Sequence, residues 1–402
     1  MKDILIIAHF AQVPGEAGNG RFHYIAEKMN NENQTVEIVA SSFSHNTKQQ
    51  RTVNQDQLNS ISYKLTMISE PSYNNNVSIK RLYSHYIMGK NLKKYLENRK
   101  KPDVIYCSVP SLDIGKVAAK YAKQNHVRFI IDVQDIWPEA FKMLLNIPLI
   151  SNIIFYPMKK QADYIYKAAD DIVAVSKTYV NRALEVNKKC KEAHSVFLGT
   201  ELSYFDDLIL PNRFKDKPIS EIWLAYVGTL GKCYDLTCVI DALKILRVNG
   251  IRNIKFIVMG DGPLKSRFQD YARECKINAE FTGRLDYGKM VGILAACDIA
   301  INPISKGAAN SIINKVGDYA AAGLPVLNTQ ECLEYKNLVD DYEIGFNCEN
   351  NNSYDLAVKL MRLYRNPNLR KLMGENNRRL AEVMFDRKKT YTEITDLLEE
   401  GK

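Results

Sequence analysis

The sequence has no uninterrupted apolar run of the roughly 18 residues that a membrane-spanning helix needs. Its most apolar stretch, Met143–Met158, is broken by Pro148 and Pro157. The apolar start of the chain, Met1–Ile7, is too short for the core of a signal peptide. We expect it to lead directly into the first strand. The sequence therefore predicts no transmembrane segment.

Paired cysteines and histidine clusters are also lacking. The eight cysteines form no C-x-x-C pair, and all six histidines lie in the N-terminal half. This pattern argues against a zinc site and a disulfide framework, and it favours a reducing, cytoplasmic environment. We find no Ser-His-Asp or Cys-His arrangement for nucleophilic catalysis and no D-x-D pair for a metal. The sequence thus predicts a metal-independent protein without a cofactor.

What is present is an excess of positive charge, and it is unevenly placed. Residues 1–200 hold 27 Lys and Arg against 18 Asp and Glu, whereas residues 201–402 hold 28 of each kind. Residues 51–100 alone hold nine cations and three anions. Nucleic acid and an anionic membrane both suit such a surface. We favour the membrane, because the chain contains no nucleic-acid-binding motif that we can identify.

Short apolar strands alternate with helical segments along the whole chain, which has ordinary globular composition and room for two domains. Such alternation is typical of doubly wound parallel sheets. We expect a long polar loop over residues 41–76, a basic, Tyr-rich helix over 78–98 and an interdomain linker over 201–220. The expected strands include residues 4–8, 36–40, 102–107, 128–133, 171–175, 222–228, 255–259, 280–285 and 299–302.

The stretch Asn310–Pro325 carries the most information about function. A Ser- and Asn-rich loop leads into an Ala-rich helix that ends at Gly323, and a short strand follows. Lys315 falls in the first helical turn, where a cation is unfavourable unless it faces an anion. The sequence therefore points to a phosphate-bearing ligand here, although an ordinary crossover with an extended Lys315 side chain is the alternative.

This stretch resembles the signature of glycosyltransferase family 4. In that family an acidic residue, seven others and a second acidic residue precede A-x-G-x-P. Here the acidic positions are Asn310 and Asp318, and Ala321–Pro325 supplies the rest. An Asn-Lys pair ahead of an acid-Tyr helix is similar to the fucosaminyltransferase type of O-antigen and capsule transferases. The resemblance implies transfer of a sugar from a nucleotide diphosphate donor, with UDP as the expected nucleotide.

The resemblance also assigns roles within the second half of the chain. Asp318 would accept hydrogen bonds from the ribose hydroxyls, and Asn310, which cannot serve as a base, would ease repulsion near the leaving diphosphate. Lys315 and Lys232 would supply the positive charge that relatives draw from an Arg and Lys pair. The remaining donor contacts that we carry over are Gly228, Thr229, Arg284, Leu285, Ser311 and Asn314.

Two positions in the first half complete the expected site. Gly18-Asn19-Gly20 follows a strand and lacks the dinucleotide fingerprint; the family places a glycine-rich loop here against the sugar and diphosphate, and a simple tight turn is the alternative. Gln134 and Asp135 follow another strand, where relatives contact the acceptor or sugar. Asp135 would act as a general base or would only cap the segment that follows.

The resemblance implies the GT-B architecture, an α/β fold of two Rossmann-like domains facing each other across a cleft. We expect an acceptor-side domain over residues 1–200 and a donor domain over 201–384, with the C-terminal helix of residues 385–402 packing back on the first. The family retains anomeric configuration and needs no enzymic nucleophile.

We accordingly expect a cytoplasmic retaining transferase, peripheral on the inner face of the plasma membrane, that acts on a lipid-linked, polyprenyl diphosphate acceptor. Arg81, Lys90, Lys93 and Lys94 would face anionic lipid, with Met143–Met158 either beside them or in the core. Two alternatives stay open: a non-hydrolysing UDP-sugar 2-epimerase and a non-catalytic subunit that binds nucleotide sugar.

Overall fold

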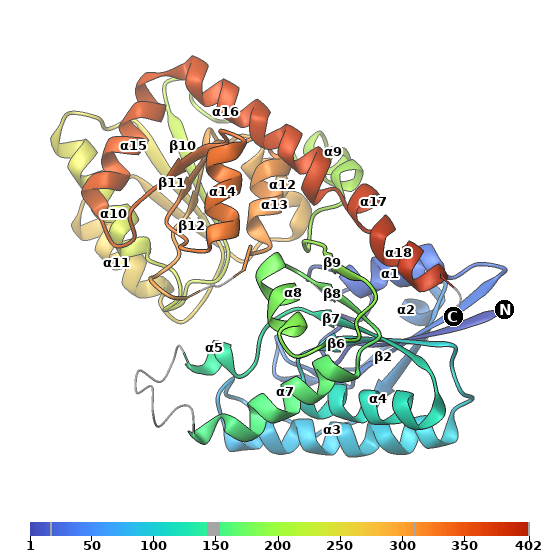
Figure 1. Cartoon of the computed structure of the whole chain (residues 1–402). Helices are drawn as coiled ribbons and strands as arrows, with labels where there is room; N and C mark the ends of the chain where they lie inside the picture. Colours follow the sequence, from blue (N-terminus) through green and yellow to red (C-terminus); the bar gives the residue numbers. More distant parts are fainter. Residues whose placement is uncertain (17, 143–152, 309–310, 401–402) are drawn as a thin grey trace. The chain divides into compact units, whose positions relative to one another are not determined.

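A computed structural model of the chain describes residues 1–16, 18–142, 153–308 and 311–400. The chain forms two compact units. Unit 1 runs from Met1 to Val196 and includes the C-terminal segment from Tyr391, and unit 2 spans Phe197–Thr390. Each unit is built on one parallel sheet with helices on both faces (Figure 1), as the alternating apolar pattern predicts.

The sheet of unit 1 has seven parallel strands in the order β5-β2-β1-β6-β7-β8-β9. Apolar runs buried on both faces explain why these strands lie inside the unit: every side chain of β6 is buried. The strands are β1 (Lys2–Ile7), β2 (Gln34–Ser41), β5 (Lys64–Ile68), β6 (Val104–Val109), β7 (Arg128–Val133), β8 (Asp171–Ala174) and β9 (Ala193–Ser195).

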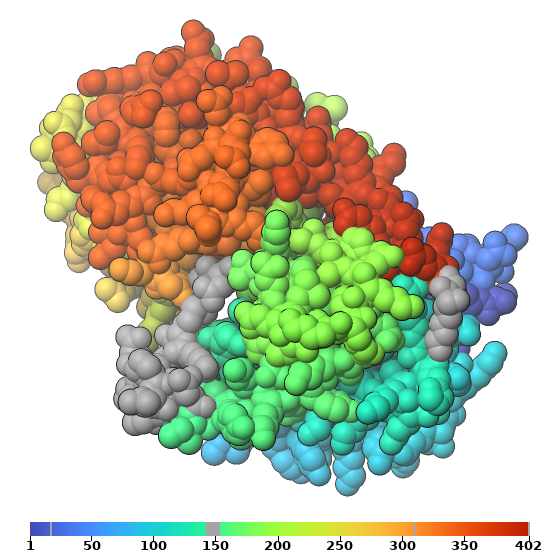
Figure 2. All heavy atoms as spheres, in the orientation of Figure 1, coloured from blue at the N-terminus to red at the C-terminus, as the bar shows by residue number. Residues whose placement is uncertain are grey.

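Helices cover both faces of this sheet. On one face α3, α4 and α7 lie side by side, and Figure 2 shows their atoms closing over it together with α8. On the other face, α1 and α18 contribute Ile25, Ile394 and Leu398 to one apolar core. The helices of unit 1 are α1 (Arg21–Met29), α2 (Gln55–Asn59), α3 (Ile79–Asn98), α4 (Leu112–Asn125), α5 (Glu139–Lys142), α7 (Tyr156–Ala168), α8 (Lys177–Leu184) and α18 (Thr392–Glu399).

The expectation of a polar loop over residues 41–76 is wrong. This segment contains the edge strand β5, the helix α2 and a small antiparallel pair, β3 (Phe43–Ser44) and β4 (Gln49–Gln50). Strand β5 pairs with β2 from Glu37 opposite Lys64 to Ser41 opposite Ile68. It escapes detection because an edge strand of five residues, two of them polar, carries little periodic signal, and pairing with β2 supplies its stability.

Helix α3 forms close to where we expect it, with Ser78 accepting a hydrogen bond from the Arg81 N–H as N-cap. The placement of Arg81 on an exposed basic face is wrong, because its side chain lies against aromatic rings and the residue is only 8% exposed. Lys90, Lys93 and Lys94 are exposed as predicted. Of Met143–Met158, residues 143–152 lie outside the described residues, while Ile153 and Ile154 are exposed.

The sheet of unit 2 has six parallel strands in the order β12-β11-β10-β13-β14-β15. They are β10 (Ile222–Val227), β11 (Ile254–Met259), β12 (Ala279–Gly283), β13 (Ile299–Asn302), β14 (Val326–Asn328) and β15 (Gly345–Asn347). Side chains alternate across β10: Trp223 and Ala225 enter one core, and Leu224 and Tyr226 enter the other. The sheet is therefore packed between two apolar cores, one on each face.

Helices on both faces complete unit 2. Those around the site are α9 (Leu202–Ile209), α10 (Leu236–Val248), α12 (Tyr287–Leu294) and α13 (Lys315–Ala321). The others are α11 (Lys265–Glu274), α14 (Leu333–Asp341), α15 (Ser353–Arg365), α16 (Pro367–Leu380), the π-helix Ala381–Phe385 and α17 (Arg387–Thr390).

The expectation that residues 201–220 form a linker is wrong as well. Leu202 and Phe205 of α9 are buried in the core of unit 2, and α9 packs against α12. Proline and polar residues after Ile209 gave the segment a linker-like composition, but its apolar residues recur at helical spacing and bury one face.

Candidate functional site

The candidate site of unit 2 lies where β10 and β13 are neighbours. From β10 the strand order runs to β11 and β12 on one side and to β13, β14 and β15 on the other. Open parallel sheets bind ligands outside the carboxyl ends of their strands at such a reversal. The loops that follow β10 and β13 are therefore the first place to look for ligand-binding groups.

Two glycines at the strand ends allow neighbouring atoms to approach the backbone closely. Gly228 follows β10 with φ +140°, and a Cβ added there would lie 2.9 Å from the Lys315 Nζ atom. At Gly260, which follows β11, an added Cβ would lie only 1.8 Å from the carbonyl oxygen of Gly228. Both positions accordingly require glycine, and the β10 loop packs directly against the backbone of its neighbour.

Lys315 is the most unusual residue of this region. The residue is 8% exposed, and its Nζ has no hydrogen-bond partner among the described residues. The ammonium lies 4.1 Å from the ring centre of Tyr226 and 4.0 Å from that of Tyr234. Burial lowers the pKa of Lys315 well below its ordinary value. A buried cation without a counter-ion is costly, so a bound anion would stabilise this arrangement.

Asp318 is held by two hydroxyl groups. Its Oδ1 accepts hydrogen bonds from Tyr287 Oη at 2.9 Å and from Thr200 Oγ1 at 3.1 Å. Burial raises the pKa of Asp318, and these two hydrogen bonds act in the opposite direction. No hydrogen bond to Oδ2 is found among the residues that the structure describes. One oxygen thus fixes the carboxylate and the other can accept from a ligand hydroxyl.

The other predicted donor residues of unit 2 surround these two. Thr229, Lys232, Arg284 and Asn314 are exposed, and Leu285 packs against the core. Ser311 is half-buried, and its carbonyl accepts a hydrogen bond from Gln330 Nε2 at 2.6 Å. Asn310 lies outside the described residues. The structure therefore brings Gly228 and Lys315 into contact, while Asp318 has separate partners.

Sequence reasoning missed the four side chains that fix these groups: Tyr226, Tyr234, Thr200 and Tyr287. Tyr234 lies in the loop between β10 and α10, close in sequence to Gly228, and this position was a usable signal. Tyr226 belongs to a buried strand, and Thr200 lies 118 residues from Asp318 in sequence. Contacts at such separation leave no local pattern.

In unit 1 the predicted Gly18-Asn19-Gly20 turn leads into α1. Gly20 is the N-cap in the left-handed region, with φ 70°, and its N–H donates to Gln12 Oε1 at 3.3 Å. A Cβ at Gly18 would lie 2.4 Å from the Gln12 side chain. Gly20 thus serves the left-handed backbone conformation of the turn, and Gly18 leaves room for the Gln12 side chain.

Gln134 and Asp135 follow β7. Asp135 accepts hydrogen bonds from the Ile136 N–H at 2.9 Å, Trp137 Nε1 at 3.2 Å and Tyr179 Oη at 3.4 Å. Burial raises the pKa of Asp135. These contacts fix the carboxylate, and the described residues give it no contact with a backbone N–H two or three residues on, as an N-cap would have. Gln134 Nε2 is buried without a hydrogen-bond partner in the described part of the chain.

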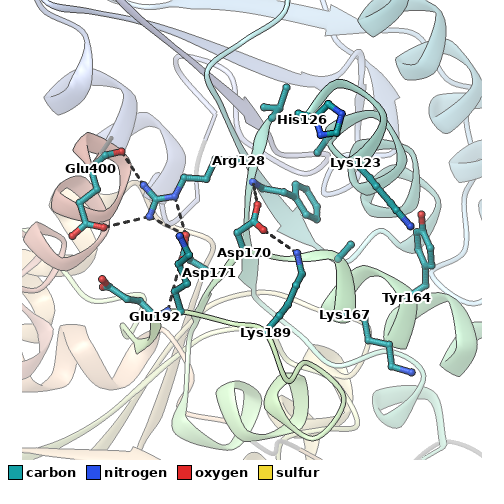
Figure 3. A pocket seen from close by; sticks show the side chains of 15 residues that line it. Lys123, His126, Arg128, Tyr164, Lys167, Asp170, Asp171, Lys189, Glu192 and Glu400 are labelled. Carbon is teal, nitrogen blue, oxygen red and sulfur yellow. Dashed lines mark hydrogen bonds and ion pairs between the residues drawn. The ribbon is translucent and has the colours of Figure 1, made fainter. Parts of the chain in front are cut away.

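A pocket of about 790 Å³ lies elsewhere in unit 1 (Figure 3). Its residues gather at the amino ends of β7 and β8, away from the carboxyl ends where parallel sheets bind ligands. Arg128 pairs with Asp171 at 2.8 Å, and Lys189 pairs with Asp170 at 2.8 Å. Its charges largely neutralise one another, so we do not assign it a ligand.

Two searches of the described residues gave negative results. No helix there is long and apolar enough to cross a membrane. No group of three or more His, Cys, Asp and Glu side chains in the described ranges is placed to hold a metal ion.

Comparisons with known proteins place the chain among glycosyltransferase-like sequences and folds. Residues 212–380 match the family model described as glycosyl transferases group 1. An uncharacterised glycosyltransferase of Methanocaldococcus jannaschii is 28% identical over 58% of this chain, and the chain spans 59% of that relative's length. Sucrose-phosphate synthase from Thermosynechococcus elongatus has a TM-score of 0.75 at 14% identity, covering 99% of this chain and 98% of its own. The Anabaena protein HepE in complex with UDP has a TM-score of 0.71 at 13% identity, covering 99% of both chains.

The solved structures show the fold, because their identity to this chain is low. They confirm the predicted α/β fold of GT-B type with two Rossmann-like halves. The family match and the glycosyltransferase relatives support the predicted transferase enzyme. They do not distinguish the fucosaminyltransferase type from other glycosyltransferases.

Proposed function

We propose that this chain is a retaining glycosyltransferase that moves a sugar from a UDP-sugar donor to a lipid-linked glycan. The observation that carries the proposal is the buried ammonium of Lys315, which has no hydrogen-bond partner in the described structure and contacts the glycine turn after β10. A nucleotide diphosphate brings the negative charge that this cation lacks.

The nucleoside part of the donor is assigned to Asp318. A carboxylate oxygen can accept hydrogen bonds from both hydroxyls of a ribose diol, and Tyr287 and Thr200 hold the other oxygen in place. Uracil is our choice of base because HepE of Anabaena, which shares the fold, binds UDP. Arg284 and Leu285, which follow β12, would lie beside the base, and Lys232, Ser311 and Asn314 beside the phosphates.

The reaction that we propose breaks the bond between C1 of the sugar and an oxygen of the β-phosphate. The acceptor hydroxyl forms the new bond to C1 from the same face, and its proton passes to the leaving phosphate oxygen. UDP leaves with the electron pair of the broken bond, and configuration at C1 is retained. Positive charge at Lys315 would stabilise the leaving diphosphate, so no metal ion is required.

For the acceptor we propose a polyprenyl diphosphate-linked sugar at an anionic membrane. Helix α3 supports this assignment because its first half exposes Ile79, Leu82, Tyr83 and Tyr86, with Ile79 85% exposed. Lys80, Lys90, Lys93 and Lys94 are exposed on the same helix. Apolar side chains beside cations are typical of helices that lie in the interface of an anionic bilayer.

This assignment would place the protein on the cytoplasmic face of the plasma membrane. We further propose that it belongs to the fucosaminyltransferase type and acts in surface polysaccharide synthesis, such as that of O-antigen or capsule. The Asn314–Lys315 pair ahead of Asp318–Tyr319 supports the subtype, because that combination marks the resemblance in the sequence.

The proposal is tested by turnover with a panel of UDP-sugars and a short-chain polyprenyl diphosphate sugar as acceptor. We expect UDP release coupled to a product whose mass increases by one sugar residue, with the α or β configuration of the donor. An epimerised donor without a heavier product would instead identify the epimerase. Binding of UDP-sugar without turnover of any kind would identify the non-catalytic subunit.

Membrane attachment is tested by changing Lys80, Lys90, Lys93 and Lys94 together to Glu. Because each cation near an anionic surface contributes about 1 kcal/mol, liposome affinity should fall by about 1000-fold. The matched control reverses four exposed lysines of unit 2, namely Lys244, Lys276, Lys289 and Lys371, and should bind liposomes almost as the wild type does. Equal loss in both variants, or no binding by the wild type at low salt, contradicts the membrane assignment.

A further inference from the structure

Arg81 is a buried cation that forms no ion pair with any described carboxylate. Its residue exposure is 8%. Other buried arginines of unit 1 have acidic partners within hydrogen-bond distance: Arg21 pairs with Asp132 at 2.7 Å and Arg182 with Glu139 at 2.6 Å. Because buried charges in folded proteins are normally paired, the exception at Arg81 calls for an anion that comes from outside the chain.

The guanidinium of Arg81 is held firmly in place. Its Cζ lies 4.8 Å from the ring centre of Trp137, 5.8 Å from that of Phe10 and 5.9 Å from that of Tyr73. Nη1 donates to the Asn76 carbonyl at 2.6 Å. Nε lies 3.4 Å from His85 Nε2. Aromatic rings and neutral acceptors therefore fix the group without neutralising its charge.

The two acids whose charges act on Arg81 are committed to other groups. Glu70 contacts His9 Nε2 at 2.7 Å and accepts from the hydroxyls of Ser41 and Ser84. Asp135 accepts from Trp137 and Tyr179, as described above. Neither forms an ion pair with the guanidinium among the described residues, so neither neutralises its charge, which an arginine keeps at neutral pH.

A second cation lies beside the same turn. Lys48 Nζ donates to Asn76 Oδ1 at 2.5 Å, and it lies 3.3 Å from His45 Nδ1 and 5.0 Å from the Tyr73 ring centre. Asn76 thus contacts Arg81 through its carbonyl and Lys48 through its side chain. No carboxylate in the described residues pairs with Lys48 either. Burial, followed by the charges of Lys48 and Arg81, lowers the pKa of His45 to about 3, which keeps this ring neutral.

The position of this cluster suits a ligand. Phe10 follows β1 and Asn76 follows β5, while Lys48 lies in the turn between β3 and β4, which come after β2. All three thus come after the carboxyl ends of parallel strands. Arg81 is in the first turn of α3, a helix of 20 residues whose next exposed side chains are Leu82 and Tyr83. One helix therefore offers a cation to an anionic group and exposed apolar side chains to an apolar chain.

We propose that Arg81 and Lys48 form a phosphate-binding site for the diphosphate of a prenyl diphosphate acceptor. This inference rests on the proposed function, because it supplies the acceptor with its anchoring contacts in unit 1. Arg81 would donate to phosphate oxygens from its planar guanidinium, and Lys48 would add a second charge. The prenyl chain would lie along the apolar residues at the start of α3.

The test is a calorimetric titration of the full chain with farnesyl diphosphate after the donor site has been saturated with UDP. Inorganic pyrophosphate and farnesol are titrated in parallel, to separate the charge from the chain. The variants are Arg81→Gln and Lys48→Gln, and the matched control is Lys120→Gln, an exposed lysine of α4. UDP affinity is measured for every variant.

We expect the wild type to bind farnesyl diphosphate more tightly than pyrophosphate and to ignore farnesol. Lys48→Gln and Arg81→Gln should each weaken farnesyl diphosphate binding at least about tenfold, with UDP affinity within twofold of wild type. Lys120→Gln should change neither. If Arg81→Gln also loses UDP binding, its effect is structural and the decision rests on Lys48→Gln, whose side chain is only half-buried.

Three results would overturn the inference while leaving the donor assignment intact: UDP binds but farnesyl diphosphate does not, both variants bind farnesyl diphosphate as wild type does, or pyrophosphate binds as tightly as farnesyl diphosphate. A wild type that fails to bind UDP contradicts the proposed function instead. In that case titration without UDP still reports on Arg81 and Lys48 alone.

Discussion

Lys315 in unit 2 and Arg81 in unit 1 are both buried cations beyond the carboxyl ends of a parallel sheet, yet their surroundings differ. The Lys315 ammonium contacts two tyrosine faces and has no hydrogen-bond partner among the described residues. Arg81 has a backbone carbonyl, a histidine nitrogen and three aromatic rings around it. An arginine stays charged in any such place, whereas burial lowers the pKa of Lys315. Arg81 therefore offers a permanent charge, and Lys315 one that a bound anion would restore.

Arg21 shows what a complete buried pair looks like in the same molecule. Its guanidinium donates to both oxygens of Asp132, at 2.7 and 3.3 Å, and Tyr106 Oη also donates to that carboxylate. Nothing is left for an external ligand to neutralise. Burial alone therefore does not distinguish the two kinds of cation. A cation that is paired with a carboxylate stabilises the fold, whereas one with only neutral partners can bind an external anion.

The largest effect should follow from breaking the complete pair. Asp132→Asn keeps the shape of the side chain but leaves the Arg21 charge uncompensated in a site where the arginine is 2% exposed. Removal of one partner from a buried pair costs about 3–5 kcal/mol of the free energy of unfolding. Hydrogen exchange in peptides of unit 1 would measure this loss. Arg81→Gln should cost far less, and equal losses would refute the distinction between the two arginines.

A smaller effect is expected at Lys315. Lys315→Met preserves length and removes the charge, so UDP affinity should fall roughly 10- to 100-fold, the range for lost hydrogen bonds to charged groups. Uridine affinity should be nearly unchanged, because uridine carries no phosphate. The melting temperature without ligand should stay constant or rise, since a buried amine without a hydrogen-bond partner among the described residues is replaced by an apolar side chain. Lys232→Met, at an exposed position, is the matched control and should weaken UDP binding less.

Acid should weaken nucleotide binding through Asp318. Burial raises the pKa of this carboxyl, so on lowering the pH it becomes protonated sooner than an ordinary aspartate and loses acceptor capacity. UDP affinity should then fall as the pH drops through that raised pKa. Tyr287→Phe removes a donor that favours the ionised form, and it should move this transition upward by roughly one pH unit.

Calorimetry of UDP and uridine between pH 4.5 and 8 would measure the transition. Using uridine as well separates Asp318 from the titration of the phosphates. Asp318→Asn should abolish the acid transition for uridine. If the transition persists in that variant, Asp318 does not contact the ribose.

Much of the fold could be predicted because long apolar strands and helices carry their own period. Strand β6 and helix α4 are examples, with buried residues at the spacing that each element imposes. Strand β5 could not, because five residues at a sheet edge depend on pairing with β2. Helix α9 carries a helical period of apolar residues, but the proline and polar residues after Ile209 masked it.

The candidate site divides in the same way. A lysine in the first turn of α13 is a local misfit from which the sequence predicts a phosphate-bearing ligand, and that stays a prediction; the structure shows the side chain buried. Its aromatic neighbours come from β10 and from the loop after it, some 80 residues earlier in sequence, as the contacts with Tyr226 and Tyr234 show. Arg81 looked like one more surface cation, because the rings that bury it come from Phe10, Tyr73 and Trp137, on three separate segments.

Removal of metal ions should have the smallest effect: we expect no change in UDP affinity or in sugar transfer. If protein cations neutralise the diphosphate, then EDTA should leave UDP affinity and sugar transfer within twofold of their untreated values. The reason is that the charge at Lys315 is part of the chain, whereas a metal ion would be removed by the chelator. The matched measurement repeats the experiment with Lys315→Met, in which added Mg²⁺ or Mn²⁺ could partly replace the missing charge. Rescue of that variant by a divalent ion, with no effect of EDTA on the wild type, would place the lysine at the phosphates. A wild type that loses transfer in EDTA and regains it with Mg²⁺ would show that the buried lysine alone does not neutralise the leaving group.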